Sequence, residues 1–254
     1  SSFAGKGAFV KALVLAGGYA TRLHPVTLEA SKPLLKVNGR PIVDYVLDGI
    51  ETLGDVDTTY VVTNAKFFQD YVEWAKTQQR PFDVVPLSDG TTSNADRLGA
   101  IGDIQFAIET QSVDDDLLIV GGDNLFDFSL RPLRDLQRAA GRSVLGCYDV
   151  GSLDLVSLYS EVHIEKGLVS SFVEKPETPT SPLIGILCYA LRRQDVPLVR
   201  RYLEEGRGPD KAGHLIQWMR TVTEVAAYVF EGRWIDIGTR AELDKAEKQW
   251  SCPA

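Results

Sequence analysis

The sequence predicts an α/β fold in which a mixed, mainly parallel β-sheet is flanked by helices. Through the first half of the chain, short apolar runs of strand-forming residues alternate with amphipathic helical patterns, and this alternation is typical of a parallel sheet with crossover helices. Two of the apolar runs stop abruptly at paired glycines, Gly17-Gly18 and Gly121-Gly122. Polar residues follow both pairs, as expected where buried strands reach the carboxyl edge of such a sheet.

The expected elements follow in order along the chain. Strands are predicted at Ala12–Ala16, Thr59–Thr63, Asp83–Pro86, Asp116–Val120 and Ser143–Val150, and helices at Ile42–Leu53, Phe67–Thr77, Ile101–Thr110 and Leu130–Ala140. Beyond residue 150 the pattern changes, and two alternating segments around Lys166-Gly167 predict a hairpin. The remaining predictions are strands at Leu183–Leu191 and Thr223–Phe230 and helices at Pro197–Glu205, His214–Thr221 and Ala241–Trp250.

Composition limits the classes of function. The net charge of −8 and the isoelectric point near 5.0 argue against binding to nucleic acid or to an acidic membrane surface. Cys147, Cys188 and Cys252 are odd in number and lack metal-ligand spacing, so we expect free thiols in a reducing compartment. No apolar run is long enough to span a membrane and no signal peptide is recognisable. A cytoplasmic protein is therefore expected.

No internal repeat or linker-like stretch divides the chain, so we expect one domain over residues 10–251. Residues 1–9 are small and glycine-rich, and we expect a disordered terminus or the remnant of a tag.

The loop after the first strand is equipped to bind an anion. Gly17 and Gly18 allow a sharp turn that exposes backbone N–H groups, and Thr21, Arg22 and Lys32 add a hydroxyl and two cations. The spacing matches neither the G-x-G-x-x-G dinucleotide fingerprint nor a P-loop. Because the overall charge of the chain is negative, a phosphorylated ligand must be held by such local groups.

Two acidic motifs could complete a site for this anion. Asp123 directly follows a buried apolar run, and Asp236 lies between two isoleucines, where an unpaired carboxylate would be costly to bury. Near a polyphosphate, the useful role of carboxylates is to hold Mg²⁺. The alternative for Asp123 is a residue that closes a turn. Nothing in the sequence alone places the two carboxylates side by side.

A third motif, Ser171–Pro176, contains Glu174 and Lys175 at the end of a predicted strand. Strand alternation places the two side chains on opposite faces unless the following proline bends the chain. The alternative is an ordinary pair of solvated charges.

Together these motifs resemble those of the sugar-1-phosphate nucleotidyltransferases, or NDP-sugar pyrophosphorylases. The family pattern G-G-x-G-T-R-L-x-P-x-T, K-P-L-L, a strand-ending Asp, V-E-K-P and W-x-D-x-G-T occurs in order at Gly17–Thr27, Lys32–Leu35, Asp123-Asn124, Val173–Pro176 and Trp234–Thr239. The resemblance covers Lys11 to Trp250 and implies a Rossmann-like fold. It also implies transfer of a nucleotidyl group from a nucleoside triphosphate to a sugar 1-phosphate, such as glucose 1-phosphate, with release of pyrophosphate.

The resemblance further implies a role for individual residues. Residues 10–125 would form the nucleotide-binding half, and residues 126–251 the half that binds the sugar phosphate. Arg22 would hold the β- and γ-phosphates, Lys32 the α-phosphate, and Asp123 and Asp236 the Mg²⁺ ion. The other expected nucleotide contacts are Leu15, Ala16, Gly17, Gly18, Thr21, Asn94 and Gly99. The expected contacts to the acceptor are Asn124, Gly146, Glu174, Lys175, Gly185 and Trp234. The five residues expected to be catalytic are Arg22, Lys32, Asp123, Lys175 and Asp236.

The sequence departs from the family pattern at two points. Ala20 replaces the usual glycine before Thr21, a change that is harmless if this position has ordinary helical backbone angles. Asn94 aligns with a glutamine that reads the base in relatives using dTTP or UTP. Its shorter side chain leaves UTP, dTTP, CTP and GTP open.

Two alternative functions remain from the sequence alone. The same chemistry could act on another acceptor, such as phosphocholine, a phosphonate or a heptose phosphate. A catalytically inactive nucleotide-sugar-binding homologue is the second alternative, although no expected metal ligand or phosphate-binding cation is missing. The oligomeric state, monomer or small homo-oligomer, is not encoded in any recognisable motif.

Overall fold

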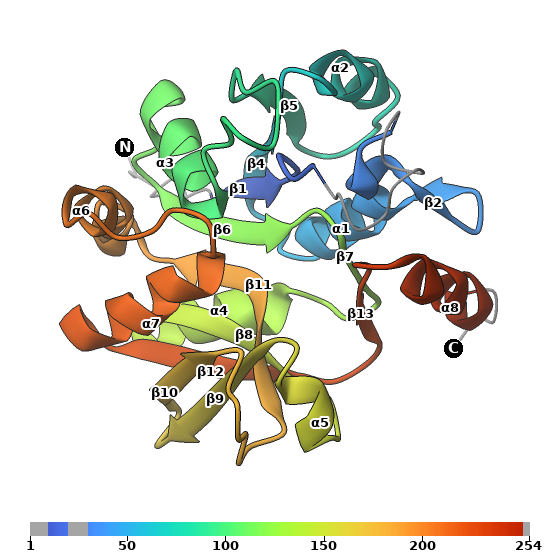
Figure 1. Cartoon of the computed structure of the whole chain (residues 1–254). Helices are drawn as coiled ribbons and strands as arrows, with labels where there is room; N and C mark the ends of the chain where they lie inside the picture. Colours follow the sequence, from blue (N-terminus) through green and yellow to red (C-terminus); the bar gives the residue numbers. More distant parts are fainter. Residues whose placement is uncertain (1–9, 20–29, 251–254) are drawn as a thin grey trace, which may run out of the picture.

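The computed structural model describes residues 10–19 and 30–250 and contains a nine-stranded sheet (Figure 1). The strand order is β5-β4-β1-β6-β11-β8-β12-β10-β9. The strands are β1 (Val10–Leu15), β4 (Val56–Thr63), β5 (Asp83–Ser88), β6 (Asp116–Gly121), β8 (Ser143–Asp149), β9 (Ser160–Glu165), β10 (Leu168–Glu174), β11 (Leu183–Leu191) and β12 (Val225–Phe230). Within this sheet β10 and β11 run against the other strands. The mixed, mainly parallel α/β fold is thus confirmed.

Burial explains why the central strands read as continuous apolar runs. In β1, Ala12, Leu13 and Val14 are completely buried, because helices cover both faces of the sheet. The apolar side chains form one large cluster on each face. Helices α1 (Ile42–Glu51), α2 (Phe68–Lys76) and α4 (Arg131–Ala140) contribute to the first cluster. Helices α3 (Ala100–Thr110), α6 (Leu198–Glu204) and α7 (Ala212–Val222) contribute to the second and lie along the left of Figure 1.

The carboxyl ends of β1 and β6 meet at one edge of the sheet. Leu15 lies in register with Gly121, and the Gly122 amide donates to the Leu15 carbonyl at 2.9 Å. Both glycine pairs therefore stand side by side, and the loops that follow them leave the sheet together. Because β1 and β6 are parallel, the glycine loop and the motif that contains Asp123 lie at the same edge of the sheet.

Smaller elements complete this edge. Asn124–Phe126 (β7) pairs with Trp234–Asp236 (β13) in an antiparallel ribbon, and a second ribbon joins β2 (Lys36–Val37) to β3 (Arg40–Pro41). Two short 3₁₀ helices (Lys32–Leu34 and Arg193–Asp195), α5 (Leu153–Val156) and α8 (Arg240–Trp250) are the remaining elements. Arg40 and Pro41 form the second strand of this ribbon by pairing with Val37 and Lys36.

The predicted hairpin after residue 150 is present as β9 and β10. Its turn residues Lys166 and Gly167 both have positive φ, at +51° and +78°, which is the backbone that a two-residue type I′ turn requires. Cys147 and Cys188 are buried free thiols, while Cys252 lies outside the described residues. In the part of the chain that the structure describes, no helix has the length and apolar character to cross a membrane.

Candidate functional site

The described part of the glycine loop is held against the sheet from two sides. The Ala16 amide donates to the Val62 carbonyl at 2.8 Å, and the buried Asn64 amide group donates to the Gly17 carbonyl at 3.1 Å. A Cβ atom at Gly17 would lie 2.5 Å from an oxygen of Asp103, so any larger residue there would have to displace the Asp103 carboxylate. Among the described residues, none lies within 4 Å of the corresponding position at Gly18. Gly18 therefore leaves its backbone open to a ligand.

Part of the predicted phosphate loop lies outside the residues that the structure describes. Ala20, Thr21 and Arg22 lie outside the described residues. The expected roles of Thr21 and Arg22, and the expected tolerance of Ala20, stay predictions.

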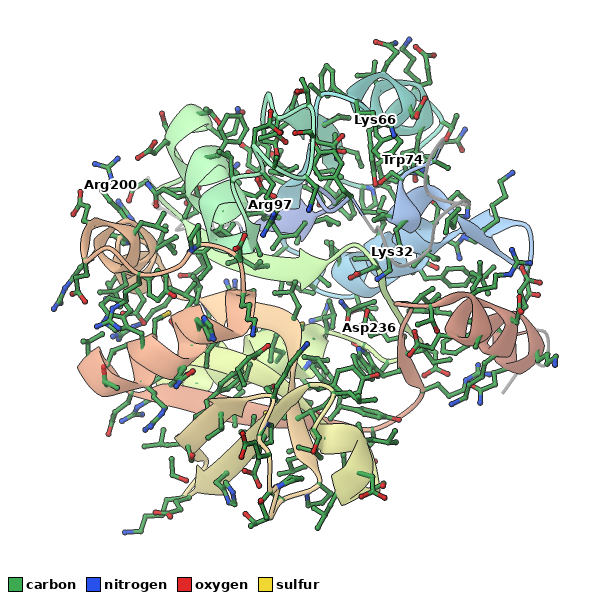
Figure 2. The ribbon with its side chains drawn as sticks, viewed as in Figure 1. Lys32, Lys66, Trp74, Arg97, Arg200 and Asp236 are labelled. Carbon is green, nitrogen blue, oxygen red and sulfur yellow. The ribbon has the colours of Figure 1, made fainter. Side chains whose placement is uncertain are left out.

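Lys32 brings the two acidic motifs together. Its ammonium nitrogen lies 2.6 Å from Asp123 Oδ2 and 3.6 Å from Asp236 Oδ1. Asp123 follows β6, Asp236 ends β13, and Lys32 begins the 3₁₀ helix Lys32–Leu34. Figure 2 shows Lys32 and Asp236 near the end of β6 and beside β13. The sequence could not place these carboxylates side by side, but both approach one nitrogen atom in the structure.

The electrostatics of this triad favour a cation. Partial burial, together with the negative charge of Asp123, raises the pKa of Asp236 to about 6 although Lys32 opposes the shift. Burial alone would lower the pKa of Lys32, but the two carboxylates outweigh it and the pKa is raised. The ammonium therefore compensates two crowded carboxylates. The Asp236 side chain is still 36% exposed, so that a ligand can reach it.

The donor set is compatible with a hard divalent cation. No group of three or more His, Cys, Asp or Glu side chains suited to metal binding occurs within residues 10–19 and 30–250. Asp123 and Asp236 are nevertheless oxygen donors that converge on one point. One or two carboxylates are all that Mg²⁺ usually takes from a protein when water and phosphate oxygens supply its other ligands.

Asn124 and Trp234 support the two aspartates from behind. The Asn124 side-chain amide contacts Asp123 Oδ1 at 3.3 Å, and its oxygen accepts a hydrogen bond of 2.8 Å from the Trp234 indole. Across the ribbon, Asn124 is in register with Asp236, and the Asp123 carbonyl accepts from the Ile237 amide at 3.4 Å. Because the side chains of Asn124 and Trp234 make these hydrogen bonds, they hold the two aspartates in position. Their expected contact with the acceptor stays a prediction.

Glu174 and Lys175 lie where β10 approaches the start of α7. Partial burial raises the pKa of Glu174, although the nearby positive groups of Lys211, His214 and Lys175 oppose the shift. Lys175 is exposed and has a positive φ of +47°, and its amide donates to the Tyr159 carbonyl at 2.7 Å. The chain therefore bends sharply after Glu174, so the expected strict alternation of the two side chains ends here.

The two glycines expected at the sugar have a clear packing role. A Cβ atom at Gly185 would lie 2.6 Å from the Phe172 ring, and one at Gly146 would lie 2.9 Å from both the Cys188 carbonyl and the Phe230 ring. Close packing within the sheet thus explains both residues. Backbone contact between these glycines and a sugar stays a prediction.

Sequence reasoning missed Gly213, at the start of α7. A Cβ atom there would lie 2.6 Å from the Glu174 carboxylate and 2.9 Å from the Phe172 ring. This glycine lets α7 approach Glu174 closely. Its position directly before the predicted helix His214–Thr221 was the available indication.

The two residues expected at the base line a common cavity with the glycine loop. Asn94, Gly99, Gly17 and Gly18 all border a space of about 330 Å³ that also reaches Asp123. Gly99 has a φ of +80°, and a Cβ atom there would lie 2.7 Å from the Pro209 carbonyl oxygen. Glycine is therefore required at this position, and the residues expected to bind the nucleotide border one continuous space.

Sequence reasoning also missed two acids of this cavity, Asp89 and Asp103. Asp103 is in the first turn of α3, and only 6% of its surface is exposed. Its position between Ile101 and Ile104, on the apolar face of a predicted helix, was the available indication.

Comparisons with known proteins agree with the fold and with the motifs. The family model described as "Nucleotidyl transferase" matches residues 11–251. The chain is 29% identical to a glucose-1-phosphate thymidylyltransferase from Streptomyces antibioticus (92% of this chain, 64% of the relative) and 25% identical to a mannose-1-phosphate guanyltransferase from Candida albicans (90% and 61%). It thus spans a little over three fifths of the length of these curated relatives.

A solved structure shows the same fold. A UDP-glucose pyrophosphorylase from Acinetobacter baumannii is 18% identical, with a TM-score of 0.77 over 95% of this chain and 93% of that one. The family match extends over nearly the whole described chain, and it confirms at family level the resemblance drawn from the motifs. The chain therefore belongs to the nucleotidyl transferase family.

Proposed function

We propose that this protein transfers a nucleotidyl group from a nucleoside triphosphate to a sugar 1-phosphate and releases pyrophosphate. The observation that carries the proposal is the convergence of Asp123 and Asp236 on Lys32, beside the open backbone of Gly18. This arrangement suits a reaction between two anions that must be neutralised and aligned. The names of the two relatives, which include hexose 1-phosphates, support a hexose acceptor.

The proposed reaction does not require the protein to remove a proton from the acceptor. A sugar phosphate is already largely dianionic at neutral pH, because its second pKa is about 6, so the attacking oxygen needs no general base. Mg²⁺ held by Asp123 and Asp236 would supply positive charge to the phosphates. Lys32, which is only 13% exposed, holds an ammonium at this site and stabilises negative charge where the nucleotide phosphates meet the carboxylates.

The acceptor would lie toward β10 and α7. Glu174 can accept hydrogen bonds from sugar hydroxyls, and Lys175 with Lys211 would attract the sugar phosphate. Gly213 keeps α7 close enough for its first residues to border this region. We propose residues 10–251 as the unit that performs the reaction. The buried free thiols Cys147 and Cys188 support a cytoplasmic location for it.

Pyrophosphate release tests the proposal. The protein is assayed with Mg²⁺ and a panel of nucleoside triphosphates, each with glucose 1-phosphate, mannose 1-phosphate, phosphocholine or a heptose phosphate. We expect release that depends on a hexose 1-phosphate. Release with phosphocholine or the heptose phosphate alone would instead identify a different acceptor. Nucleotide-sugar binding with no turnover across the whole panel would contradict the proposal and indicate a binding protein.

The Asp123→Asn variant tests the site itself. Loss of one transition-state contact of this kind costs about 3 to 4 kcal/mol, so turnover should fall at least about 100-fold with unchanged thermal stability. Asp135→Asn, on the exposed surface of α4, is the matched control and should retain full activity. Comparable turnover in Asp123→Asn would refute the assignment.

A further inference from the structure

Asn64 is a buried side chain that uses both ends of its amide. It directly follows β4 and has no exposed surface. Its side-chain nitrogen donates to the Gly17 carbonyl at 3.1 Å. Its side-chain oxygen accepts from the amide of Phe67, the residue before α2, at 3.2 Å. Asn64 thus links the start of α2 to the glycine loop.

The hydrogen bond at Gly17 fixes the direction of the next amide. The carbonyl of Gly17 and the N–H group of Gly18 belong to the same peptide group. In a planar trans peptide, the C=O and N–H bonds point in opposite directions. Because the Gly17 carbonyl points toward Asn64, the Gly18 N–H bond points away from Asn64.

The Gly18 amide is a free donor at the edge of the cavity. Gly17 and Gly18 border the space of about 330 Å³, whereas Asn64 does not and therefore lies behind the loop. Among the described residues, none lies within 4 Å of a Cβ position at Gly18, and none accepts a hydrogen bond from its amide. The side of the loop opposite Asn64 is thus open to a ligand.

A second contact holds the residue that follows this amide. The Tyr19 hydroxyl lies 3.0 Å from Thr91 Oγ1, and the Thr91 hydroxyl donates to Asp89 Oδ1 at 2.8 Å. Because the Thr91 hydroxyl has only one proton, Tyr19 is the donor in the first of these contacts. Gly18 therefore stands between two residues that are held in place, and its amide keeps its direction without a ligand.

The charges around the loop favour Gly18 over Gly17 as the position of an anion. A Cβ atom at Gly17 would lie 2.5 Å from an oxygen of Asp103 and 3.5 Å from one of Asp89. Ionised carboxylates only accept hydrogen bonds, as phosphate oxygens do. Neither acid comes within 4 Å of the corresponding position at Gly18. The open donor thus lies on the side of the loop that these acids leave free.

We propose that Asn64 is a positioning residue that aims the Gly18 amide at the phosphate chain of the nucleoside triphosphate. This inference rests on the proposed nucleotidyl transfer. Asn64 acts through the loop and does not touch the ligand, because it lies behind Gly17. A donor that is fixed before the reaction stabilises charge on the phosphates without reorganisation of the protein. Support of α2 alone would use only the side-chain oxygen of Asn64.

Asn64→Asp separates this role from a purely structural one. Aspartate keeps the size of the side chain, and its oxygen can still accept from the Phe67 amide. An ionised aspartate cannot donate to the Gly17 carbonyl, so two acceptors would face each other there. We expect kcat/KM for the nucleoside triphosphate to fall about 10- to 100-fold, because loss of one fixed donor costs up to about 1,000-fold. KM for the hexose 1-phosphate should change less than about twofold. A purely structural role predicts unchanged activity in Asn64→Asp.

Asn64→Ala tests whether the added charge explains a loss in Asn64→Asp. It removes the donor without adding an acid, and the Phe67 amide keeps a contact of 3.3 Å to the Asn64 backbone carbonyl. The same loss of kcat/KM is therefore expected. Asp70→Asn, which changes an exposed acid in the first turn of α2, is the control and should keep full activity. Thermal melting of each variant checks that it folds.

Inorganic pyrophosphate with Mg²⁺ probes the Gly18 amide without turnover. Calorimetry should show binding that is about tenfold weaker in Asn64→Asp and Asn64→Ala than in the parent. In protein that carries isotope-labelled glycine, pyrophosphate should shift the amide resonance of Gly18, and both variants should lose most of this shift. The measurement on the parent needs no variant. A Gly18 resonance that pyrophosphate leaves unchanged there would overturn the inference.

The outcomes distinguish this inference from the proposed function. Full activity and unchanged pyrophosphate affinity in Asn64→Asp would overturn the positioning role while leaving nucleotidyl transfer intact. Equal losses for the triphosphate and for the hexose 1-phosphate would indicate a general structural defect and would also overturn it. If the parent turns over no triphosphate, the proposed function fails. Pyrophosphate binding then decides the role of Asn64, and equal affinities in parent and variants would refute that role.

Discussion

The carboxyl of Asp103 should make the stability of the ligand-free protein depend on pH in a characteristic direction. Its pKa is raised to about 8 in the folded protein, whereas an unfolded chain should show an ordinary value of about 3.9. Between these values the folded state binds one proton more than the unfolded state does. Stability from this group is therefore complete below about pH 4 and is lost as the pH rises toward 8.

The magnitude follows from the size of the shift. Each pH unit in this range changes the free energy of unfolding by at most about 1.4 kcal/mol. From pH 5 to pH 8 the limit is thus about 4 kcal/mol. We expect about half of this limit, about 2 kcal/mol, because interacting carboxyl groups release their protons over a wider pH range than a single group does.

The Asp103→Asn variant isolates this effect, because an asparagine side chain keeps the shape and the donor but cannot ionise. Urea unfolding followed by tryptophan fluorescence gives the free energy of unfolding at pH 5, 6, 7 and 8. The difference between variant and parent should shift in favour of the variant by about 2 kcal/mol over this range. Asp70→Asn is the control for other titrating groups. Curves for parent and Asp103→Asn that run parallel from pH 5 to 8 would show that Asp103 is ionised throughout and would refute the reasoning.

Three further predictions concern buried charges. Arg134→Met should destabilise the fold by about 3 to 5 kcal/mol in urea unfolding, because this 3% exposed arginine is the ion-pair partner of Asp116 and one of two arginine partners of Asp55; a change below about 1 kcal/mol would contradict this. Glu161→Gln should cost about 1 to 3 kcal/mol and speed proteolysis near residue 180, since this carboxylate accepts both backbone and side-chain hydrogen bonds there; an unchanged cleavage rate would count against it. Lys32→Met should lower kcat at least about 100-fold, whereas the exposed neighbour Lys36→Met should not; equal losses in both would argue against a specific role.

The strands that consist of long, buried apolar runs could be predicted from the sequence. β1 and β6 were predicted because their side chains are buried on both faces, so that nearly every position is apolar. The ribbon of β2 and β3 was not predicted, because two residues per strand are too few to show a periodicity. Pairing of β13 with β7 was also beyond reach, since it depends on the closing of a very long loop.

The same distinction applies to the site. Gly17 and Asp123 were predicted to share an edge because parallel strands end together. Contact of Lys32 with both aspartates was not predictable, because it depends on the β7–β13 ribbon. Asp89 was missed because an acid after a strand usually closes a turn, and its contact with Asp103 depends on the packing of α3.

The β7–β13 ribbon also has a consequence for the order of events during synthesis. Trp234 and Asn124, which are hydrogen-bonded in this ribbon, stand 110 positions apart in the chain. Asp123 therefore reaches its place in the growing polypeptide long before Asp236 emerges. Until residues 234–236 have left the ribosome and paired, an incomplete chain can form its first strand but cannot assemble the aspartate pair. The nascent protein should consequently be inactive until the residues of α8 are being synthesised.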